Sequence, residues 1–303
     1  MPSLLRKLDH PVLLLVITML LWGGNSVVGR AVREDIPPVT LAFWRWTIAA
    51  AVVAPFVWRQ FIKDLPALKA GWKETLLLGL TGVALFNTFL YEGLRHTTAI
   101  NTLTLQSAIP ALVLVIGALI FREKIPGRIW GGVLLSMLGV LVIATHGEIG
   151  RLTHLGFGIG EVWMLAAVAV YALYTAALRL RPKNAHPMSF LLATFLIGVI
   201  FLAPFYLWER GARGGVDLTP TTLAAFLYVG LFPSLIAYIA FNRAVEAIGA
   251  PAASPYLHLT PLFGILLAMV FLGERPEAYH FIGGAFIAAG IFWATRKVRT
   301  QET

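Results

Sequence analysis

Polar side chains interrupt long apolar runs of this sequence, at positions where they could bind a small solute. Asn87 and Tyr91 are four residues apart in one run, and Tyr238 and Asn242 have the same spacing in a later run. Residues four apart lie on one face of a helix. Each pair offers an amide and a hydroxyl, which hydrogen-bond without carrying a charge. We interpret the two faces as the wall of a binding cavity, with hydrogen bonds between helices as the alternative.

Other candidates for the same cavity lie in three further runs. They are Asn101, Gln106, Trp163, Ser254 and His258. Ser254 and His258 share a helical face in a run that prolines interrupt, and broken helices are common at transporter sites. His258 could bind substrate or carry a proton, or be an interior histidine with satisfied hydrogen bonds. Trp163 could stack on a ligand or belong to the aromatic belt at the membrane surface.

Arg45 is the one full charge well inside an apolar run. A central arginine costs about 2.5–3.5 kcal/mol on insertion scales. We expect a structural arginine bound to helix ends, with an anchor for a substrate carboxylate as the alternative. Glu123 and Glu274 lie at run ends, where we expect them to cap helices or pair with neighbouring basic residues. No carboxylate lies at the centre of a run, so the usual sign of proton or sodium coupling is missing.

The apolar runs that hold these residues predict a polytopic helical membrane protein. Hydrophobic residues make up 58% of the 303-residue chain and charged residues 13%, against about 25% charged in soluble domains. About 20 apolar residues cross a bilayer as a helix. We predict ten such spans, at 12–28, 39–57, 75–91, 99–121, 129–145, 162–178, 188–208, 223–241, 247–272 and 279–295.

Composition also narrows the function. The chain has no cysteine, which excludes disulfides and thiolate metal sites. Without a recognisable catalytic or phosphate-binding motif, we expect neither an enzyme nor a cofactor or metal. The net charge of +9 is attributed to loops rather than to nucleic acid. Sixteen Lys and Arg residues fall on the side that holds the N-terminus and seven on the other, which predicts that both termini are cytoplasmic.

The spans are organised as an internal repeat. Residues 244–290 match residues 93–139: adding 151 turns Pro110 into Pro261 and Gly139 into Gly290. Earlier spans match at a spacing of 149. We therefore divide the chain into a first five-helix repeat, 1–150, and a second, 151–303. Because five is odd, the second copy must be inverted, which is typical of secondary transporters with a midplane site. We expect spans three and eight to cross at the centre.

The order of these features resembles the EamA family of the drug/metabolite transporter superfamily. The resemblance rests on Trp22-Gly23, on Pro38 followed by Arg45, on Pro110 and Pro261, and on a terminal Glu before a Gly-rich span. In the second copy the position equivalent to Arg45 is occupied by Thr194, so this copy departs from the pattern. The chain looks closest to YddG-type amino-acid exporters, which implies ten helices and export by alternating access across the inner membrane. Its partners would be the bilayer and small-molecule substrates, with the oligomeric state left open.

Two other function classes remain open at the level of sequence. One is a multidrug or sugar-phosphate-type carrier of the same superfamily, for which Arg45 and His258 are the only cationic candidates. The other is a membrane protein that does not transport, such as an embedded enzyme or a lipid flippase.

Overall fold

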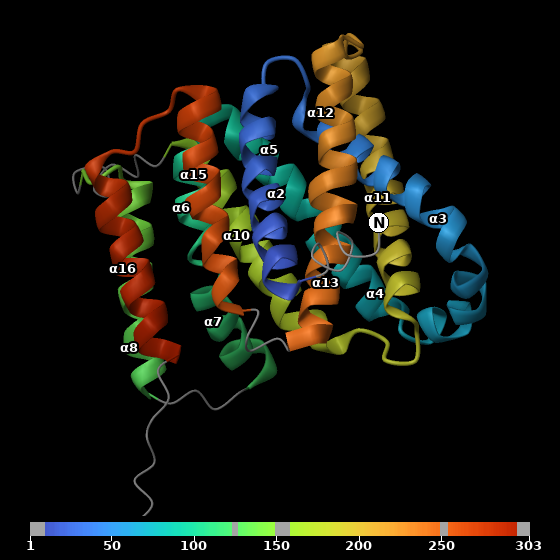
Figure 1. Cartoon of the computed structure of the whole chain (residues 1–303), viewed down its shortest axis with the longest axis horizontal. Coiled ribbons are helices and arrows are strands. Elements are labelled where there is room, and N and C mark those ends of the chain that lie inside the picture. Colours follow the sequence, from blue (N-terminus) through green and yellow to red (C-terminus); the bar gives the residue numbers. More distant parts are fainter. Residues whose placement is uncertain (1–9, 123–126, 149–157, 249–253, 296–303) are drawn as a thin grey trace, which may run out of the picture.

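The computed structural model describes residues 10–122, 127–148, 158–248 and 254–295, which form helices joined by short turns (Figure 1). The first half contains α2 (Pro11–Ala31), α3 (Pro38–Ala70), α4 (Trp72–Leu78), the π-helical segment η1 (Gly79–Leu85), α5 (Phe86–His96), α6 (Ala99–Gln106), α7 (Ile109–Phe121) and α8 (Gly127–Ala144). The second half contains α10 (Ile159–Ala177), η2 (Leu178–Leu180), α11 (Pro187–Arg213), α12 (Pro220–Leu231), the π-helical segment η3 (Phe232–Ile236), α13 (Ala237–Ile248), η4 (Ser254–His258), α15 (Leu259–Leu272) and α16 (Ala278–Thr295).

Six of the helical stretches in the described residues are long and apolar enough to cross a membrane. A seventh would be the pair α6 and α7, which bends by 40°, and three shorter apolar helices cover 130–144, 256–272 and 278–293. The all-helical membrane fold is therefore confirmed, whereas the count of ten spans stays a prediction.

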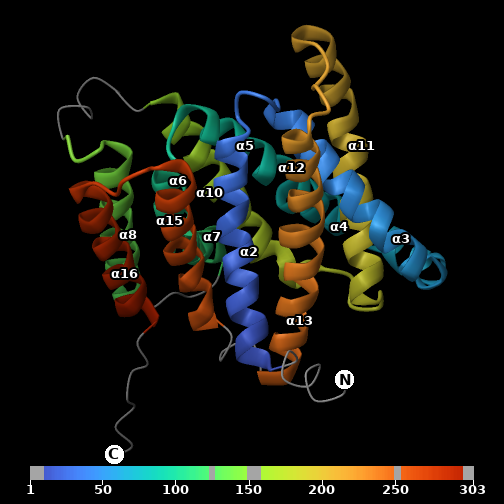
Figure 2. The same cartoon turned by 45° about the horizontal axis from the view of Figure 1, so that its top comes forward.

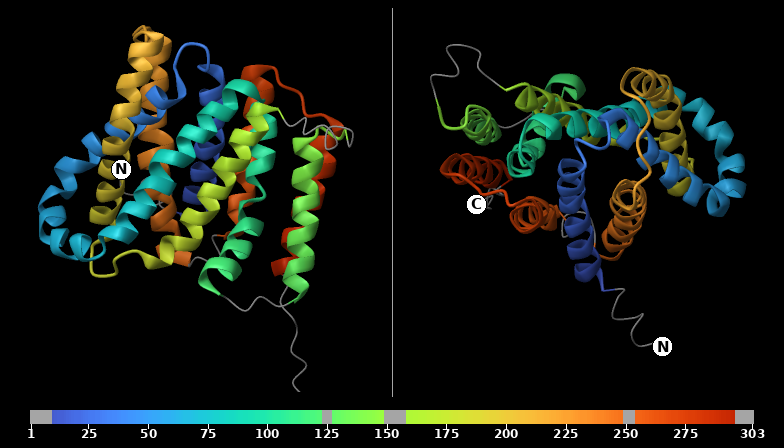
Figure 3. Two further views of the ribbon diagram at one scale, coloured as in Figure 1. Left: turned by 180° about the vertical axis from the view of Figure 1, so that it is seen from behind. Right: turned by 90° about the horizontal axis from the view of Figure 1, so that it is seen from above.

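The two halves run in opposite directions through the bundle. In Figure 1, α2 ascends while α10 descends, and the same reversal relates α8 to α16 and α6–α7 to α15 (Figures 1 and 2). The pair α8 and α16 lies at one end of the bundle and the pair α3 and α11 at the other, as the views from behind and above also show (Figure 3). The start of α2 and the end of α16 face the same side of the molecule.

The central helices are not neighbours in the way the repeat led us to expect. The third predicted span, which is α4, η1 and α5, does not pack along the eighth, which is α12, η3 and α13, within the described part of the chain. Instead α5 packs along α10, and α13 packs along α2. The predicted crossing of spans three and eight is therefore wrong. The physical reason is that the pseudo-two-fold arrangement places the first helix of each copy beside the third helix of the other copy.

Carboxylates at helix ends cap helices of the other half. Glu209, near the end of α11, accepts hydrogen bonds from the Thr40 amide at 2.7 Å and the Thr40 hydroxyl at 2.8 Å, at the start of α3. Asp64 in α3 accepts from the His186 amide at 2.9 Å, just before α11. Amide groups in the first turn of a helix lack partners within that helix. A carboxylate near the end of each of these two long helices therefore accepts a hydrogen bond from an amide at the start of the other.

Glu274 acts in the same way at the turn after α15. Its two carboxylate oxygens accept from the amides of Ala99 and Ile100, both at 3.0 Å, and Oε1 lies 3.6 Å from Arg30 Nε. The expected capping role is confirmed, with Arg30 rather than the adjacent Arg275 as its ion-pair partner. Glu123, its counterpart in the first half, lies outside the described residues.

The glycines of α8 and α16 let these two helices touch backbone to backbone. A Cβ on Gly139 would collide with the Gly283 carbonyl oxygen, and one on Gly290 would collide with that of Gly132. The two contacts are equivalent under the repeat, because 132 and 139 become 283 and 290 on adding 151. The Ser136 hydroxyl also donates to the Ile287 carbonyl at 3.3 Å. Small residues thus allow these two helices of one chain to pack closely.

Candidate functional site

A buried cluster joins three helices of the first half around Arg45. Arg45 Nη1, from α3, donates to Asn25 Oδ1 of α2 at 2.6 Å and to the Tyr91 hydroxyl of α5 at 2.9 Å. The Tyr91 hydroxyl in turn donates to Asn25 Oδ1 at 2.7 Å. All three side chains are buried, and Arg45 is only 5% exposed. We name Asn25, Arg45 and Tyr91 the arginine cluster.

The charge of Arg45 is not neutralised by a carboxylate. Among the described residues, Arg45 has no carboxylate within 4 Å. Nε of Arg45 is buried without a hydrogen-bond partner. The guanidinium carbon lies 4.8 Å from the centre of the Trp46 ring, and such a cation–π contact contributes about 0.5–2 kcal/mol. The cluster thus holds a buried cation with neutral partners only.

Four tyrosines of the second half lie on α10, α12 and α13. Tyr171 and Tyr174 of α10 have ring centres 5.5 Å apart, and the Tyr174 hydroxyl is hydrogen-bonded to Tyr238 of α13. Tyr228 lies on α12, and its hydroxyl donates to the Leu21 carbonyl of α2 at 3.4 Å. All four tyrosines are half-buried. Tyr228 lies against α2 beside Asn25, because a Cβ on Gly24 would collide with its hydroxyl.

Asn87 lies one helical turn before Tyr91 on α5. Its Nδ2 donates to the Val83 carbonyl at 3.3 Å, but its Oδ1 is buried without a partner among the described residues. Both Asn87 and Tyr238 follow directly on the π-helical segments η1 and η3. Single-turn π segments inside α-helices occur frequently at functional sites. In η3, Pro233 has no N–H, and the Ser234 hydroxyl donates to the Val229 carbonyl at 2.7 Å.

A second buried cluster surrounds Glu161 where α10 begins. Glu161 is 3% exposed, and its Oε1 accepts from the Thr97 hydroxyl and from Asn101 Nδ2, both at 2.6 Å. His146 Nε2 lies 3.2 Å from the same oxygen. The Asn101 amide is therefore engaged at the end of the bundle and not at the arginine cluster. No group of three potential metal ligands occurs in the described parts of the chain.

The other predicted site residues are dispersed. Trp163 is half-buried on α10 and packs on Phe89, with ring centres 5.2 Å apart. Gln106 is half-buried at the end of α6, and His258 is exposed at the end of η4. Asn242 and Ser254 lie in α13 and η4, but their side chains fall outside the described residues. The structure thus brings Asn87, Tyr91 and Tyr238 to the centre of the bundle.

Sequence reasoning missed four members of these clusters, namely Asn25, Thr97, His146 and Glu161. Asn25 follows Trp22-Gly23-Gly24, and its polarity within an apolar span was the available signal. Gly24, the residue before Asn25, leaves room for the Tyr228 hydroxyl, with which a Cβ at this position would collide. Glu161 and His146 flank the long polar link between the halves. Nothing in their spacing indicates that they meet, since Thr97 and Asn101 come from elsewhere in the chain.

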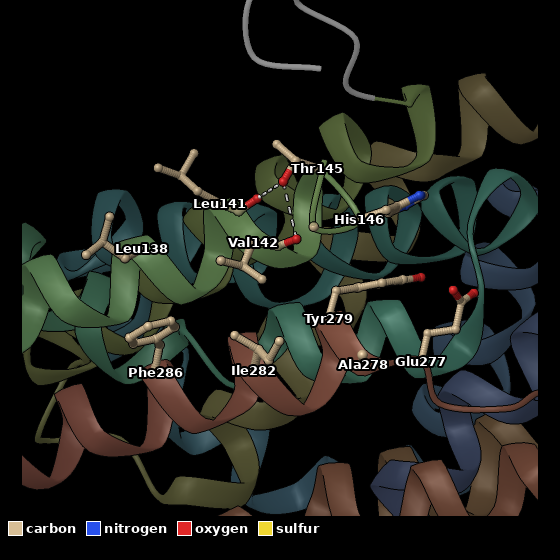
Figure 4. Close-up of a pocket in the computed structure, with 11 residues that line it drawn as sticks. Leu138, Leu141, Val142, Thr145, His146, Glu277, Ala278, Tyr279, Ile282 and Phe286 are labelled. Atoms are coloured by element: carbon tan, nitrogen blue, oxygen red, sulfur yellow. Dashed lines mark hydrogen bonds between the residues drawn. The ribbon is translucent and has the colours of Figure 1, made fainter. Parts of the chain in front are cut away.

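A groove of about 740 Å³ runs between α8 and α16, away from the arginine cluster, and His146 of the Glu161 cluster lies in its wall (Figure 4). Leu138, Leu141, Ile282 and Phe286 line most of it, and Thr145, Glu277 and Tyr279 lie at one end. Its apolar lining on an apolar helix pair is what a lipid-facing surface requires, so we do not place the polar solute site here.

Apolar helices long enough to cross a bilayer, with buried polar clusters between them, define an integral membrane protein. A sequence model of the EamA-like transporter family matches residues 10–145 and 158–296. An uncharacterized transporter of Archaeoglobus fulgidus is 30% identical over 94% of this chain and 97% of its own. The chain belongs to the EamA-like transporter family.

Two further comparisons bear on function and fold. A protein of Streptantibioticus cattleyicolor described as a probable terminal-alkyne amino-acid exporter is 26% identical, covering 96% of this chain and 95% of its own. A crystal structure of a protein of 19% identity covers 94% of this chain and 96% of its own with a TM-score of 0.60. That similarity concerns the fold alone.

Proposed function

We propose that this transporter exports small amphipathic metabolites, with amino acids, aromatic ones included, first among them. It would work by alternating access, as a YddG-type exporter in the inner membrane with both termini in the cytoplasm. In this proposal ten spans form two inverted repeats, 1–150 and 151–303, and the solute binds where the repeats meet. The observation that carries the proposal is the buried arginine cluster, with Tyr228 of the other half lying against α2 at Gly24, next to Asn25.

The chemistry of the centre favours a zwitterion with a variable side chain. The described residues around Arg45 offer hydroxyls and amides but no carboxylate, so nothing there demands a cationic drug. Tyr171, Tyr174 and Tyr238 combine apolar rings with hydroxyls, and such surfaces accept side chains of different shape. The S. cattleyicolor relative, by its description, exports an amino acid. We therefore expect broad selectivity among amino acids with apolar side chains.

The direct test is transport by the purified protein in proteoliposomes. Labelled phenylalanine and leucine should move down their gradients, and a sugar phosphate or a cationic dye should not. A hydrogen bond to a charged group contributes about 1.5–3 kcal/mol. Asn87→Ala and Asn242→Ala should therefore each lower transport at least about tenfold at unchanged protein levels. Normal transport by both variants would remove the site from this position, and transport of the dye alone would identify a multidrug carrier instead.

A further inference from the structure

We propose that Arg45 anchors the carboxylate of the transported solute and that Asn87 Oδ1 accepts a hydrogen bond from its ammonium group. The inference rests on the proposed transport function and specifies the charge of its substrates. It assigns Arg45 a binding role in addition to the structural one that its bonds to Asn25 and Tyr91 indicate.

The first argument is the unused side of the guanidinium. Arginine carries five N–H donors, and only Nη1 of Arg45 makes hydrogen bonds, to the neutral Asn25 and Tyr91. Within the described chain, Nε and Nη2 donate to nothing. The N–H bonds of Nε and Nη2 are parallel, and this is the pair that holds a carboxylate with two hydrogen bonds. Asn25 and Tyr91 thus orient the guanidinium while its carboxylate-binding edge stays available.

The second argument is the missing counter-ion. Removing one partner of a buried ion pair is strongly destabilising because an uncompensated charge remains, yet Arg45 is buried with no carboxylate within 4 Å in the described residues. The buried carboxylates among the described residues have other partners: Glu209 caps α3, Asp64 accepts from the His186 amide, and Glu161 binds Thr97 and Asn101. A solute carboxylate would supply the charge that the protein lacks.

The third argument is a matching acceptor at a suitable place. Asn87 and Tyr91 are four residues apart on α5, so their Cβ atoms lie about 5–6 Å apart. Asn87 Oδ1 is buried without a donor, and Tyr91 touches Arg45. A cation and an unpaired acceptor thus both lie along one face of α5, the cation held by Tyr91 and the acceptor one helical turn earlier, an arrangement that offers a group to each end of an α-amino acid. Arg45 Nε and Asn87 Oδ1 are shielded in this conformation, so binding requires the bundle to open toward one side.

The repeat limits the site to a single carboxylate. Thr194 occupies the position of Arg45 in the second half, and its hydroxyl donates to the Leu191 carbonyl of its own helix at 2.8 Å. The second half therefore contributes aromatic and neutral polar groups at its side of the centre. We infer a preference for monocarboxylates over dicarboxylates.

The test compares ligands that share one ring and differ in charge. L-phenylalanine, 3-phenylpropanoate, L-phenylalaninamide and phenethylamine are titrated against the purified full-length protein in detergent, with thermal stabilisation as the readout. Phenylalanine should bind most tightly, and both carboxylates should bind at least about tenfold more tightly than the amide and the amine. Leucine and leucinamide repeat the comparison without the ring. Equal binding of acid and amide, or no stabilisation by any carboxylate, would overturn the proposal.

Variants of Arg45 test whether this residue causes the preference for carboxylate ligands. Arg45→Lys keeps the charge but not the two parallel donors, so it should weaken carboxylate binding about tenfold while keeping the preference for acid over amide. Arg45→Gln should reduce that preference to about one. Thr194→Val, at the equivalent position, should leave the affinity for carboxylates and the preference for acid over amide unchanged. Because Arg45→Gln also removes structural bonds, Arg45→Lys and the ligand series with the unaltered protein decide the matter if this variant does not fold.

The two proposals fail in different ways. If phenylalanine is transported in proteoliposomes but acid and amide bind equally, the anchor is wrong and the transport function stands. If 3-phenylpropanoate binds and depends on Arg45 while no amino acid is transported, the anchor stands and the amino-acid export is wrong.

Discussion

The two halves of this transporter share a scaffold but differ at the centre. In the first half Asn25, Arg45 and Tyr91 form a charged, fully buried cluster. At the matching positions the second half has Tyr174, Thr194 and Asn242, and the described side chains among them are neutral: Tyr174 bonds to Tyr238, and Thr194 bonds to its own helix.

The shared features are those that hold helices together. The glycine contacts between α8 and α16 are reciprocal, the caps on α3 and α11 are exchanged between halves, and a π-helical segment interrupts the third helix of each. The glycine positions and the π-helical segments are alike in the two halves, whereas the positions of Asn25, Arg45 and Tyr91 differ.

The largest effect is expected from the shared helix contact. Gly139→Val and Gly290→Val each force a side chain against a backbone carbonyl, and overpacking costs about 1–3 kcal/mol, more where nothing can give way. Both variants should lower the folded yield and the melting temperature in detergent by similar amounts. Gly131→Val is the control, since a Cβ there meets nothing within 4 Å. A loss in only one of the two variants would show that the halves do not share this contact equally.

Removing single hydroxyls should distinguish the charged half from the neutral half. Tyr91→Phe removes a bond to a guanidinium, which contributes about 1.5 kcal/mol or more, whereas Tyr174→Phe removes a bond between neutral groups, with a net contribution of about 0.5–1.5 kcal/mol. Melting temperatures of the two variants, measured side by side, should therefore fall further for Tyr91→Phe. The opposite order would mean that Arg45 is held mainly by other groups.

The exchanged caps should give a smaller loss. Glu209→Ala leaves the Thr40 amide and hydroxyl without their partner, and losing such a cap costs about 0.5–2 kcal/mol. Asp64→Ala removes one backbone cap, at His186, and should have the smaller effect. Glu34→Ala serves as the control because Glu34 is exposed and pairs only with Arg33 across 3.2 Å. Thermal unfolding of the three variants should rank them in that order, and a silent Glu209→Ala would contradict the capping role.

The smallest effect is expected from His258. It is exposed at the end of η4, and no carboxylate accompanies the arginine cluster among the described residues. Transport should therefore continue in proteoliposomes without a pH gradient, and His258→Gln should change its rate less than about twofold. Transport that stops when the pH is equalised in the unaltered protein, and becomes independent of pH in His258→Gln, would instead make this histidine the proton carrier.

Local patterns in the sequence predicted the fold well. Prolines at 38, 187 and 220 mark helix starts, apolar runs mark the helices, and glycines at 139 and 290 mark a close contact. The candidate site was predicted only in part, because Asn87, Tyr91 and Tyr238 were found from spacing within one helix. The bond from Arg45 to Asn25 depends on how two helices are rotated about their axes, and the cluster at Glu161 joins three separate segments. Neither contact follows from the spacing of residues within one helix.

The π-helical segments have a consequence for the history of the chain. A π turn arises when one residue is inserted into an α-helix, and it rotates every later side chain by about 100° relative to the helix before it. Subtracting 151 places η3 (Phe232–Ile236) on residues 81–85, the last five residues of η1. The same insertion at the same place in both halves dates it before the duplication. The unit that was duplicated then already carried the wide turn, and pairing with an inverted second copy of itself would have brought both turns into one bundle.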